Sequence, residues 1–488
     1  MNKKLIVLVS ATALMSLVGC GGNGGGGSAK KVTIKYVNSW GKDYKPEVEN
    51  LITKFEAANP NIHVESITEG GYDGIHTQTN SDIASANGEY GDLVICYPDH
   101  VVDYINYGVA VDMQELIDDP KIGWTDAEEE DMIQGFLEEG RKYPVEGTYS
   151  LPYSKSTEAL YYNADVLIGL NLASVDPELN GGMPLTTDYF DNLTWEEFLD
   201  KLCPAIEKYN NALPAAEKII RDAGQGKITG ICGYDSEANL FINLCEQYGY
   251  GYTTVNPQTG KATLDFNNDN VKNLLAKFNE AGKKNYIVPS SRIENNSYCS
   301  SFFTAQNLLF NIGSTAGVGH EVSETFDVNV TAIPGAKNGN KHVISQGPSL
   351  CILAHPEDGK AMRQARIEAA WKFYNFMTNS KNAARWAVTV GYLPVRTSSL
   401  SQEVYLEYAD TTGKDPKTKE LLVAKNAQYS TVASNNVFTS PVFKGSSTAR
   451  TQVGGVMAAV LNATSGLTLA QIQALLDQAE NNIKLDME

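Results

Sequence analysis

The chain has 488 residues, of which 42% are hydrophobic and 20% charged, a composition typical of a globular protein. Its 58 acidic and 39 basic residues give a net charge of −19. A surface this acidic repels nucleic acid and attracts anionic lipid only weakly, so we expect no nucleic-acid partner. A chain of this length has room for two or more lobes.

The beginning of the chain carries the pattern of an export signal. A basic start precedes an apolar run over residues 5–18, which is shorter than the roughly 20 residues that span a bilayer. The run ends in LVGC, and Cys20 is followed by a stretch of almost pure glycine. This pattern resembles a bacterial lipobox, so we expect a cleaved signal peptide at 1–19, lipid on Cys20 and a flexible linker at 20–30. The alternatives are an ordinary secretory signal with a chance cysteine and an uncleaved membrane anchor.

Six further cysteines lie in the body of the chain. No two of them form a C-x-x-C pair, and their spacing does not match that of metal ligands. Most have apolar neighbours, which favours buried free thiols, although a disulfide in an exported protein is left open. The six are Cys96, Cys203, Cys232, Cys245, Cys299 and Cys351. The sequence indicates neither a metal site nor a cofactor.

After the linker, strand and helix patterns alternate. VTIKYV (32–37) and IHVESI (62–67) alternate as strands do, and DLVIC (92–96) is typical of a buried parallel strand. The segments between them predict helices, the first ending at Asn59-Pro60 and the second covering 72–86. Strand, helix, strand, helix, strand is the beginning of a doubly wound α/β lobe.

In such a lobe, ligands bind beyond the carboxyl ends of the strands, and two loops lie there. The loop after the first strand contains Trp40 and Asp43, and the loop after the third contains Tyr97, Asp99 and His100. An aromatic ring beside hydrogen-bonding groups suits a sugar, which presents an apolar face and a polar rim. The alternatives are that Trp40 and Tyr97 only close the edge of the sheet and that His100 is a solvated surface histidine.

The rest of the chain continues the alternation without an internal repeat. The expected strands cover 160–163, 230–234, 307–312, 328–333 and 348–353. The expected helices cover 194–209, 240–248, 271–281, 361–377, 383–390 and 468–481. DFNNDN at 265–270 departs from a calcium loop at the loop's sixth and twelfth positions, so we expect Asp269 or Asn270 to cap the helix that follows.

Several segments resemble the extracellular solute-binding proteins of bacterial ABC importers, of the maltose- and oligosaccharide-binding type. ITKFEAANPNIHVE (52–65) is similar to that family's first helix and second strand, and EGTYSLPYSKSTEALYYN (146–163) to its first crossing between lobes. The other similar segments, which follow in the family's order, are GDLVICYPDHVVDYINYGVAVDM (91–113), LTWEEF (193–198), NLLFNIGSTAG (307–317), VTAIPGAKNG (330–339), AAWKFYNFMTNSKNAARWAVTVGYLPVR (369–396) and TSGLTLAQIQALLDQAENNI (464–483). The resemblance extends from about Lys31 to the end of the chain.

The resemblance implies a two-lobed α/β periplasmic-binding-protein fold with hinge crossings and a ligand cleft between the lobes. The N-terminal lobe would hold 31–160 and 352–398, and the C-terminal lobe 161–351 and 399–488. The family's ligand loops match 38–43, 97–100 and 153–156 in the first lobe and 234–239, 313–316 and 441–446 in the second. Gly-Ser-Thr-Ala at 313–316 and Phe443 stand where many relatives carry tryptophan, which leaves the identity and length of the ligand open.

The function implied is capture of a carbohydrate, with an oligosaccharide as the first choice, by closure of the lobes and its delivery to the transmembrane subunits of an ABC permease. The protein would be a monomer on the extracytoplasmic face of the cell membrane, attached through its lipid alone. Trp40 and Tyr97 would stack on sugar rings. The other expected ligand contacts are Asp43, Asp99, His100, Tyr153, Ser154, Tyr234, Asn239, Ser314 and Phe443.

Two other classes of function are open. An anchored glycan-active enzyme would use a pair of carboxylates, but with 58 acidic residues such pairs carry no information. The sequence contains no HExxH, GxSxG or phosphate-loop motif, which favours a binding protein over an enzyme. A binding protein of this architecture could also take a polyol, a glycerol phosphate or a metal ion.

Overall fold

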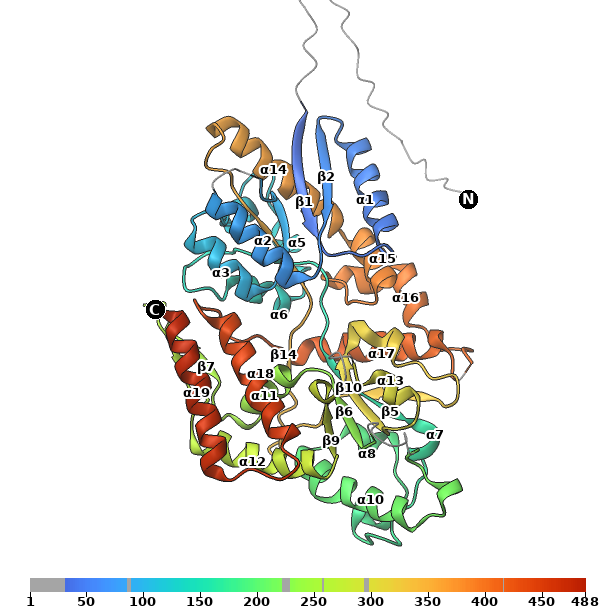
Figure 1. The fold of residues 1–488 in the computed structure, drawn as a ribbon. Coiled ribbons are helices and arrows are strands. Elements are labelled where there is room, and N and C mark those ends of the chain that lie inside the picture. Colours follow the sequence, from blue (N-terminus) through green and yellow to red (C-terminus); the bar gives the residue numbers. More distant parts are fainter. Residues whose placement is uncertain (1–30, 86–88, 222–228, 257–258, 294–297, 416) are drawn as a thin grey trace, which may run out of the picture.

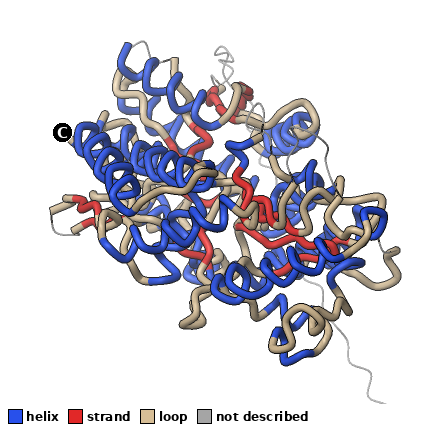
Figure 2. Tube along the Cα trace, turned by 60° about the horizontal axis from the view of Figure 1, so that its bottom comes forward, coloured by secondary structure: helices blue, strands red, loops and turns tan. Residues whose placement is uncertain are grey.

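The computed structural model describes residues 31–85, 89–221, 229–256, 259–293, 298–415 and 417–488. The expected signal peptide at 1–19 and the linker at 20–30, including Cys20, lie outside the described residues. Two lobes, each built on its own five-stranded sheet, lie one above the other in Figure 1. Figure 2 shows helices surrounding the strands. This is the two-lobed α/β fold that the sequence predicts.

The sheet of the N-terminal lobe has the strand order β2-β1-β3-β13-β4. Its strands are β1 (Val32–Asn38), β2 (Ile62–Thr68), β3 (Leu93–Cys96), β4 (Leu151–Pro152) and β13 (Ser349–Ile352). β1 pairs in parallel with β2 and β3, whereas β13 runs antiparallel to β3 and β4. The three parallel strands confirm the doubly wound pattern predicted for the start of the chain.

The helices of the N-terminal lobe pack on this sheet around one apolar core. They are α1 (Lys45–Ala58), α2 (Tyr72–Ser85), α3 (Pro98–Asn106), α4 (Gln114–Ile117), α5 (Asp126–Glu130), α6 (Gln134–Leu137), α14 (Lys360–Met377) and α15 (Ser380–Val390). Helix α1 has a proline in its first turn and ends at Asn59, where the sequence predicts its end. Its apolar face buries Val48, Leu51 and Phe55, and the Phe55 ring lies 4.9 Å from Phe373 of α14.

The sheet of the C-terminal lobe has the order β11-β5-β10-β6-β9. Its strands are β5 (Glu158–Asn163), β6 (Cys232–Tyr234), β9 (Ile287–Pro289), β10 (Phe310–Ser314) and β11 (Val328–Thr331). Along β5, Leu160 and Tyr162 join one apolar core, while Ala159 and Tyr161 join a second core on the other face. Because successive side chains of a strand point to opposite faces and a core covers each face, this inner strand is buried throughout.

The C-terminal lobe contains α19, the longest helix of the described residues, at the end of the chain. Its helices are α7 (Ala164–Leu167), α8 (Thr187–Asp191), α9 (Trp195–Glu197), α10 (Cys203–Ala212), α11 (Glu237–Tyr248), α12 (Asp269–Lys283), α13 (Ser300–Thr304), α17 (Lys419–Ala433), α18 (Ser446–Asn462) and α19 (Leu469–Met487).

Two local expectations about these helices need correction. The expected helix at 194–209 is interrupted by a π-helical turn over Phe198–Leu202. The cap of α12 is Asn268 and not Asp269 or Asn270, because the Asn268 side chain accepts from the backbone of Val271, and the helix begins two residues earlier than predicted.

The chain crosses between the lobes near 153–157 and near 344–348. Strand pairing assigns β5 to the second sheet and β13 to the first, so both crossings lie a few residues before the boundaries expected at 160/161 and 351/352. A third connection runs through α16 (Glu403–Ala409), which packs between α15 and α17 (Figure 1). Two short pairings complete the strands: β7 (Thr253–Val255) with β8 (Ala262–Leu264), and β12 (Val343–Ile344) with β14 (Val437–Phe438).

The first two crossings run side by side and share hydrogen bonds. Ser156 and Gln346 exchange backbone hydrogen bonds of 3.0 and 2.8 Å. Gly347 has a φ of +85°, and a Cβ at this position would lie 2.1 Å from the Ser154 carbonyl oxygen, so the two segments approach this closely only with glycine there. The crossings therefore form one two-stranded hinge.

A buried ion pair lies at this hinge. Lys155 is 0% exposed and Glu139 is 3% exposed, and the Lys155 ammonium donates to the Glu139 carboxylate. The same ammonium donates to the Gly347 carbonyl oxygen at 3.0 Å, which ties the first crossing to the second. A lysine without this carboxylate would be an uncompensated charge in the protein interior.

The expectation of buried free thiols is confirmed, because all six cysteines of the body are unpaired and buried. Among the described residues, no helix is both long enough and apolar enough to cross a membrane.

We expect Lys155→Met to lower the free energy of unfolding by about 3–5 kcal/mol, because it leaves the Glu139 carboxylate buried without a counter-charge. Urea denaturation measures this loss. The control is Lys54→Met, which removes the same charge from an exposed position on α1 and should change stability by less than about 0.5 kcal/mol. Equal stabilities for the two variants would contradict the structural role of the pair.

Candidate functional site

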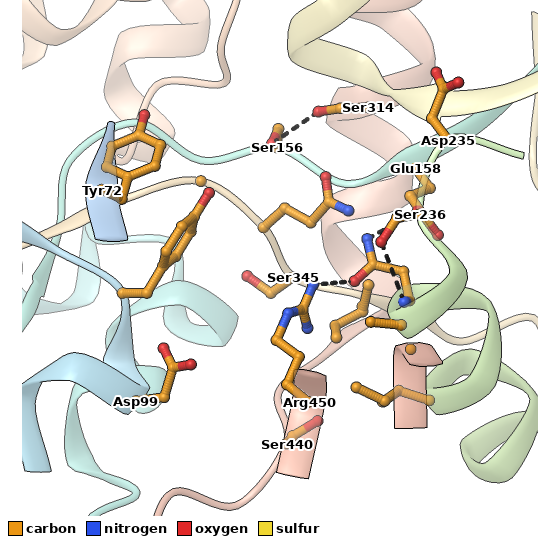
Figure 3. A pocket seen from close by; sticks show the side chains of 18 of the residues that line it. Tyr72, Asp99, Ser156, Glu158, Asp235, Ser236, Ser314, Ser345, Ser440 and Arg450 are labelled. Carbon is orange, nitrogen blue, oxygen red and sulfur yellow. Dashed lines mark hydrogen bonds between the residues drawn. The ribbon is translucent and has the colours of Figure 1, made fainter. Parts of the chain in front are cut away.

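A cleft of about 800 Å³ lies between the two lobes. Both lobes and both crossings contribute to its walls, and Figure 3 shows Tyr72 and Asp99 of the first lobe across from Glu158, Asp235 and Arg450 of the second. The cleft lies where the sequence analysis expects the ligand, beyond the carboxyl ends of β3 and β6.

Tyrosine rings form the wall that the first lobe contributes. Tyr72 begins α2, Tyr97 precedes α3, and Tyr392 follows α15, and all three line the cleft. The Tyr72 and Tyr97 rings meet edge to face with centroids 4.8 Å apart. Burial raises the pKa of Tyr97 and Tyr392, so both phenols stay neutral hydrogen-bonding groups at physiological pH. Two further tyrosines, Tyr252 and Tyr298, line the cleft from the second lobe.

A hydrogen-bonded network around Glu158 forms the floor on the side of the second lobe. The Glu158 carboxyl is 1% exposed and accepts from the Tyr234 hydroxyl at 2.8 Å, from Asn239 Nδ2 at 2.8 Å and from Asn243 Nδ2 at 2.7 Å. Because its amide nitrogen is used there, Asn239 turns its Oδ1 toward Arg450, whose guanidinium donates to it (Figure 3). The network fixes where the Arg450 guanidinium lies in the cleft.

The charged groups of the cleft are unevenly divided. Seven carboxylates line it, those of Asp73, Asp99, Glu139, Glu158, Asp235, Glu237 and Glu321. Among the described lining residues, Arg450 is the one lysine or arginine. Glu139 is neutralised by Lys155, and burial raises the pKa of Glu158 from its ordinary 4.5 to about 7. Within the described part of the chain, no group of three or more His, Cys, Asp or Glu side chains could hold a metal ion.

Serine hydroxyls supply most of the other polar groups. Nine serines line the cleft: Ser156, Ser236, Ser290, Ser300, Ser314, Ser345, Ser440, Ser446 and Ser447. The hydroxyls of Ser345, Ser440 and Ser446 are buried and have no hydrogen-bond partner among the described residues. A buried hydroxyl without a partner is costly, so these three are suited to hydrogen bonds with a bound molecule.

Five of the predicted ligand contacts line the cleft, namely Tyr97, Asp99, His100, Asn239 and Ser314. His100 is not the solvated surface histidine of the alternative interpretation. Its ring is buried and stacks on His76 with centroids 4.3 Å apart, and its Nε2 lies 3.5 Å from Asp73. Ser314 donates to Ser156 at 3.3 Å across the first crossing. Contact of these five with a solute stays a prediction.

Trp40 does not reach the cleft. It is 4% exposed, its indole nitrogen donates to the Tyr36 hydroxyl at 3.1 Å, and its ring meets Trp386 edge to face at 4.9 Å. The Trp40 ring also meets the Tyr392 ring edge to face, with centroids 6.0 Å apart. Tyr392 lines the cleft, whereas Trp40 does not. The expectation that Trp40 stacks on a sugar is therefore corrected, because neighbouring aromatic rings enclose it and it supports Tyr392 instead.

The remaining predicted contacts lie behind the cleft surface. Tyr153 is buried in the core of the first lobe and stacks on Trp386, which also donates to the Ser154 hydroxyl at 2.8 Å. Tyr234 is fully buried and acts through Glu158. Phe443 packs in the core of the second lobe, where neighbouring Pro441 and Val442 line the cleft. Asp43 is exposed and lies outside the lining.

Four residues of the cleft were not predicted from the sequence, namely Tyr72, Tyr392, Glu158 and Arg450. Tyr72 and Tyr392 each follow a glycine, Tyr72 at the beginning of α2 and Tyr392 after the end of α15. A tyrosine at the end of a helix is not by itself a sign of a ligand site. Glu158 lies inside a strand and Arg450 inside a helix, where a charged residue is ordinarily read as solvated. Their burial in one cleft depends on contacts between distant segments, for which the sequence gives no local signal.

The raised pKa of Glu158 makes stability depend on pH. Between pH 4.5 and about 7 the folded carboxyl holds a proton that the unfolded chain releases, so stability falls as the pH rises through this range. Glu158→Gln removes this titration, and we expect the wild type to lose about 3 kcal/mol more than the variant across it, since one pKa unit is worth about 1.4 kcal/mol.

Urea denaturation at several pH values measures the difference between the two slopes. Other buried carboxyls contribute equally to both proteins and cancel. The control is Glu65→Gln, which removes an exposed carboxylate from β2 and should retain the wild-type slope. A wild-type slope in Glu158→Gln would show that this carboxyl titrates normally.

A family model described as bacterial extracellular solute-binding protein matches residues 50–420 of the chain. Among curated proteins, the chain is 23% identical over 404 residues to the sn-glycerol-3-phosphate-binding periplasmic protein UgpB of Salmonella typhimurium, covering 80% of each chain. It is 22% identical over 415 residues to the protein of the same name from Escherichia coli K12, covering 81% of this chain and 82% of the relative.

Solved structures of similar fold cover nearly the whole chain. UgpB from Mycobacterium tuberculosis in complex with glycerophosphocholine has a TM-score of 0.64 at 17% identity, covering 93% of this chain and 98% of that one. The sugar-binding protein MalE from Xanthomonas citri has a TM-score of 0.66 at 16% identity, with 93% and 98% coverage. Lmo0181 from Listeria monocytogenes in complex with cycloalternan has 0.65 at 18% identity, with 94% and 99% coverage. These similarities show the two-lobed fold.

Proposed function

Because the chain belongs to the family of bacterial extracellular solute-binding proteins, and so is the solute-binding component of an ABC importer and not an enzyme, we propose that its solute is a carbohydrate. The observation that carries the proposal is the lining of the cleft. Five tyrosines and nine serines line a space of about 800 Å³, large enough for an oligosaccharide. Tyrosine rings cover the apolar faces of sugar rings, and hydroxyls and amides pair with the hydroxyls at their rim.

Capture by closure follows from the division of the site between the lobes. Tyr72, Tyr97 and Asp99 come from the first lobe, and Asn239 and Ser314 from the second. A solute that contacts both walls stabilises the closed arrangement and leaves the open one without these contacts. The permease subunits would receive the solute from the closed form.

A glycerol phosphate is the second candidate, and Arg450 is the observation that favours it. Its guanidinium takes part in none of the ion pairs among the described residues, and its partner is the neutral Asn239. Arginine is well suited to bind phosphate through two parallel hydrogen bonds. The curated relatives are named for binding sn-glycerol 3-phosphate. Against this candidate stand the carboxylates of the cleft, which repel a doubly charged anion.

Titration calorimetry with Arg450→Gln separates the two candidates. We expect a phosphate-free oligosaccharide to bind saturably, to be recovered unchanged, and to lose less than about threefold in affinity in Arg450→Gln. Loss of a charged hydrogen bond costs about 1.5–3 kcal/mol, so a phosphate held by Arg450 would instead lose about 10- to 100-fold.

The control for this experiment is Lys444→Gln, which removes an exposed positive charge near the same helix and should leave both affinities unchanged. Binding of sn-glycerol 3-phosphate or glycerophosphocholine, lost in Arg450→Gln and unmatched by any tested oligosaccharide, would replace the carbohydrate proposal by the second candidate. Turnover of the bound sugar would contradict assignment as a binding protein.

We propose further that lipid on Cys20 holds the protein at the extracytoplasmic face of the membrane. The support is the sequence around Cys20 and the glycine-rich linker that follows it. In the source cell, Cys20→Ser should move the protein from the membrane fraction to the soluble fraction and abolish incorporation of a labelled fatty acid. A variant that stays in the membrane fraction would show that another segment anchors it.

A further inference from the structure

The cleft wall of the second lobe contains two buried carboxyls that flank one asparagine. Asp235 directly follows β6, and Glu321 follows the 3-10 turn Thr315–His320 after β10. Both line the cleft. Between them, Asn311 of β10 donates its amide nitrogen to Asp235 Oδ2 at 3.3 Å and to Glu321 Oε1 at 2.8 Å. Both amide hydrogens of Asn311 are thereby used.

No basic side chain of the described chain neutralises these carboxyls. Neither Asp235 nor Glu321 takes part in an ion pair among the described residues, and Arg450 donates to Asn239. Burial is the main cause that raises the pKa of Glu321, and the nearby charge of Asp235 raises it further. Burial also raises the pKa of Asp235. The two carboxyls therefore lack a positive partner in the protein itself.

One oxygen of Glu321 also lacks a hydrogen bond. Glu321 is 3% exposed, and its Oε2 is buried without a partner among the described residues. If Glu321 is ionised, this oxygen lacks a donor, and if it is protonated there, the new hydroxyl lacks an acceptor. Asn311 Oδ1 is likewise buried without a partner. With Glu321 ionised, its Oε2 and Asn311 Oδ1 both lack a donor, and a positively charged donor in the cleft would supply these hydrogen bonds and hold the carboxyl in its ionised form.

Gly313 has no side chain and so leaves room for the two carboxyls beside β10. A Cβ on Gly313 of β10 would lie 2.7 Å from Asp235 Oδ2 and 3.3 Å from Glu321 Oε1. Any larger residue would push a methyl group between the two carboxylates and the strand. The backbone at Gly313 is not in the left-handed region, so alanine can adopt its conformation.

We infer that Asp235, Asn311 and Glu321 form a subsite for a protonated amine carried by the solute. The inference rests on the proposed function and narrows the carbohydrate to one with an amino group. An ammonium supplies three hydrogen-bond donors and the missing positive charge in one group. A divalent metal ion fits less well, because calcium takes six to eight oxygen ligands and this wall offers two carboxylates and one amide.

The test compares glucosamine with glucose and with N-acetylglucosamine, which lacks the charge, by calorimetry on the full chain. We expect the wild type to bind glucosamine at least about tenfold more tightly than either neutral sugar, a difference of about 1.4 kcal/mol. In Glu321→Gln and in Gly313→Ala this ratio should fall to about one. The matched control is Glu324→Gln, which removes an exposed carboxylate three residues further on and should keep the wild-type ratio.

Each other outcome overturns the assignment. A wild type without preference for glucosamine, or one that binds none of the three sugars, has no amine subsite. A preference that survives in both variants lies elsewhere in the cleft. Thermal stabilisation by KCl or CaCl₂ that Glu321→Gln abolishes, without any glucosamine preference, assigns the wall to an inorganic cation. Binding of an amine-free oligosaccharide with no amine preference would refute the subsite and leave the proposed function standing.

Discussion

The buried ion pair between Lys155 and Glu139 determines how the two lobes are joined. Lys155 lies in the first crossing, and its ammonium contacts both the Glu139 carboxylate of the first lobe and the Gly347 carbonyl of the second crossing. Charges in the interior are tolerated only with such partners, so this arrangement permits few alternatives. It ties the two crossings together side by side at the floor of the cleft.

The chemistry of the cleft follows from this placement. The crossings contribute Ser156, Ser345 and Gln346 to the lining, so the hinge is itself part of the binding surface. A solute that contacts these residues therefore contacts the hinge that joins the two lobes. Glu158, at the point where the first crossing becomes β5, extends the same chain of contacts through Asn239 to Arg450. Arg450 is thus connected through Asn239 to the strand that continues the first crossing.

The two walls differ in character for structural reasons. The first lobe presents Tyr72, Tyr97 and Tyr392, and behind Tyr392 lie the packed rings of Trp40, Trp386 and Tyr153. The second lobe presents carboxyls and amides that emerge from the ends of β6 and β10. Tyr252 and Tyr298 add rings to the second wall, and Asp99 and His100 add polar groups to the first, so rings and hydrogen-bonding groups together match a solute with an apolar face and a polar rim.

The two-lobed fold followed from the family resemblance, whereas the residue pattern alone was sufficient for the α/β class, for the first strands and helices and for the loop at 97–100 that borders the cleft. These depend on local periodicity and on the rule that parallel strands of one sheet end at the same edge. It was not sufficient to choose the side chains within those loops. Trp40 turns inward because Trp386 and Tyr392, from the far end of the chain, enclose its ring, and Arg450 faces the cleft because Asn239 and Glu158 hold it there. Burial of a side chain is decided by partners that are distant in sequence, and those partners are brought together only when the lobes fold.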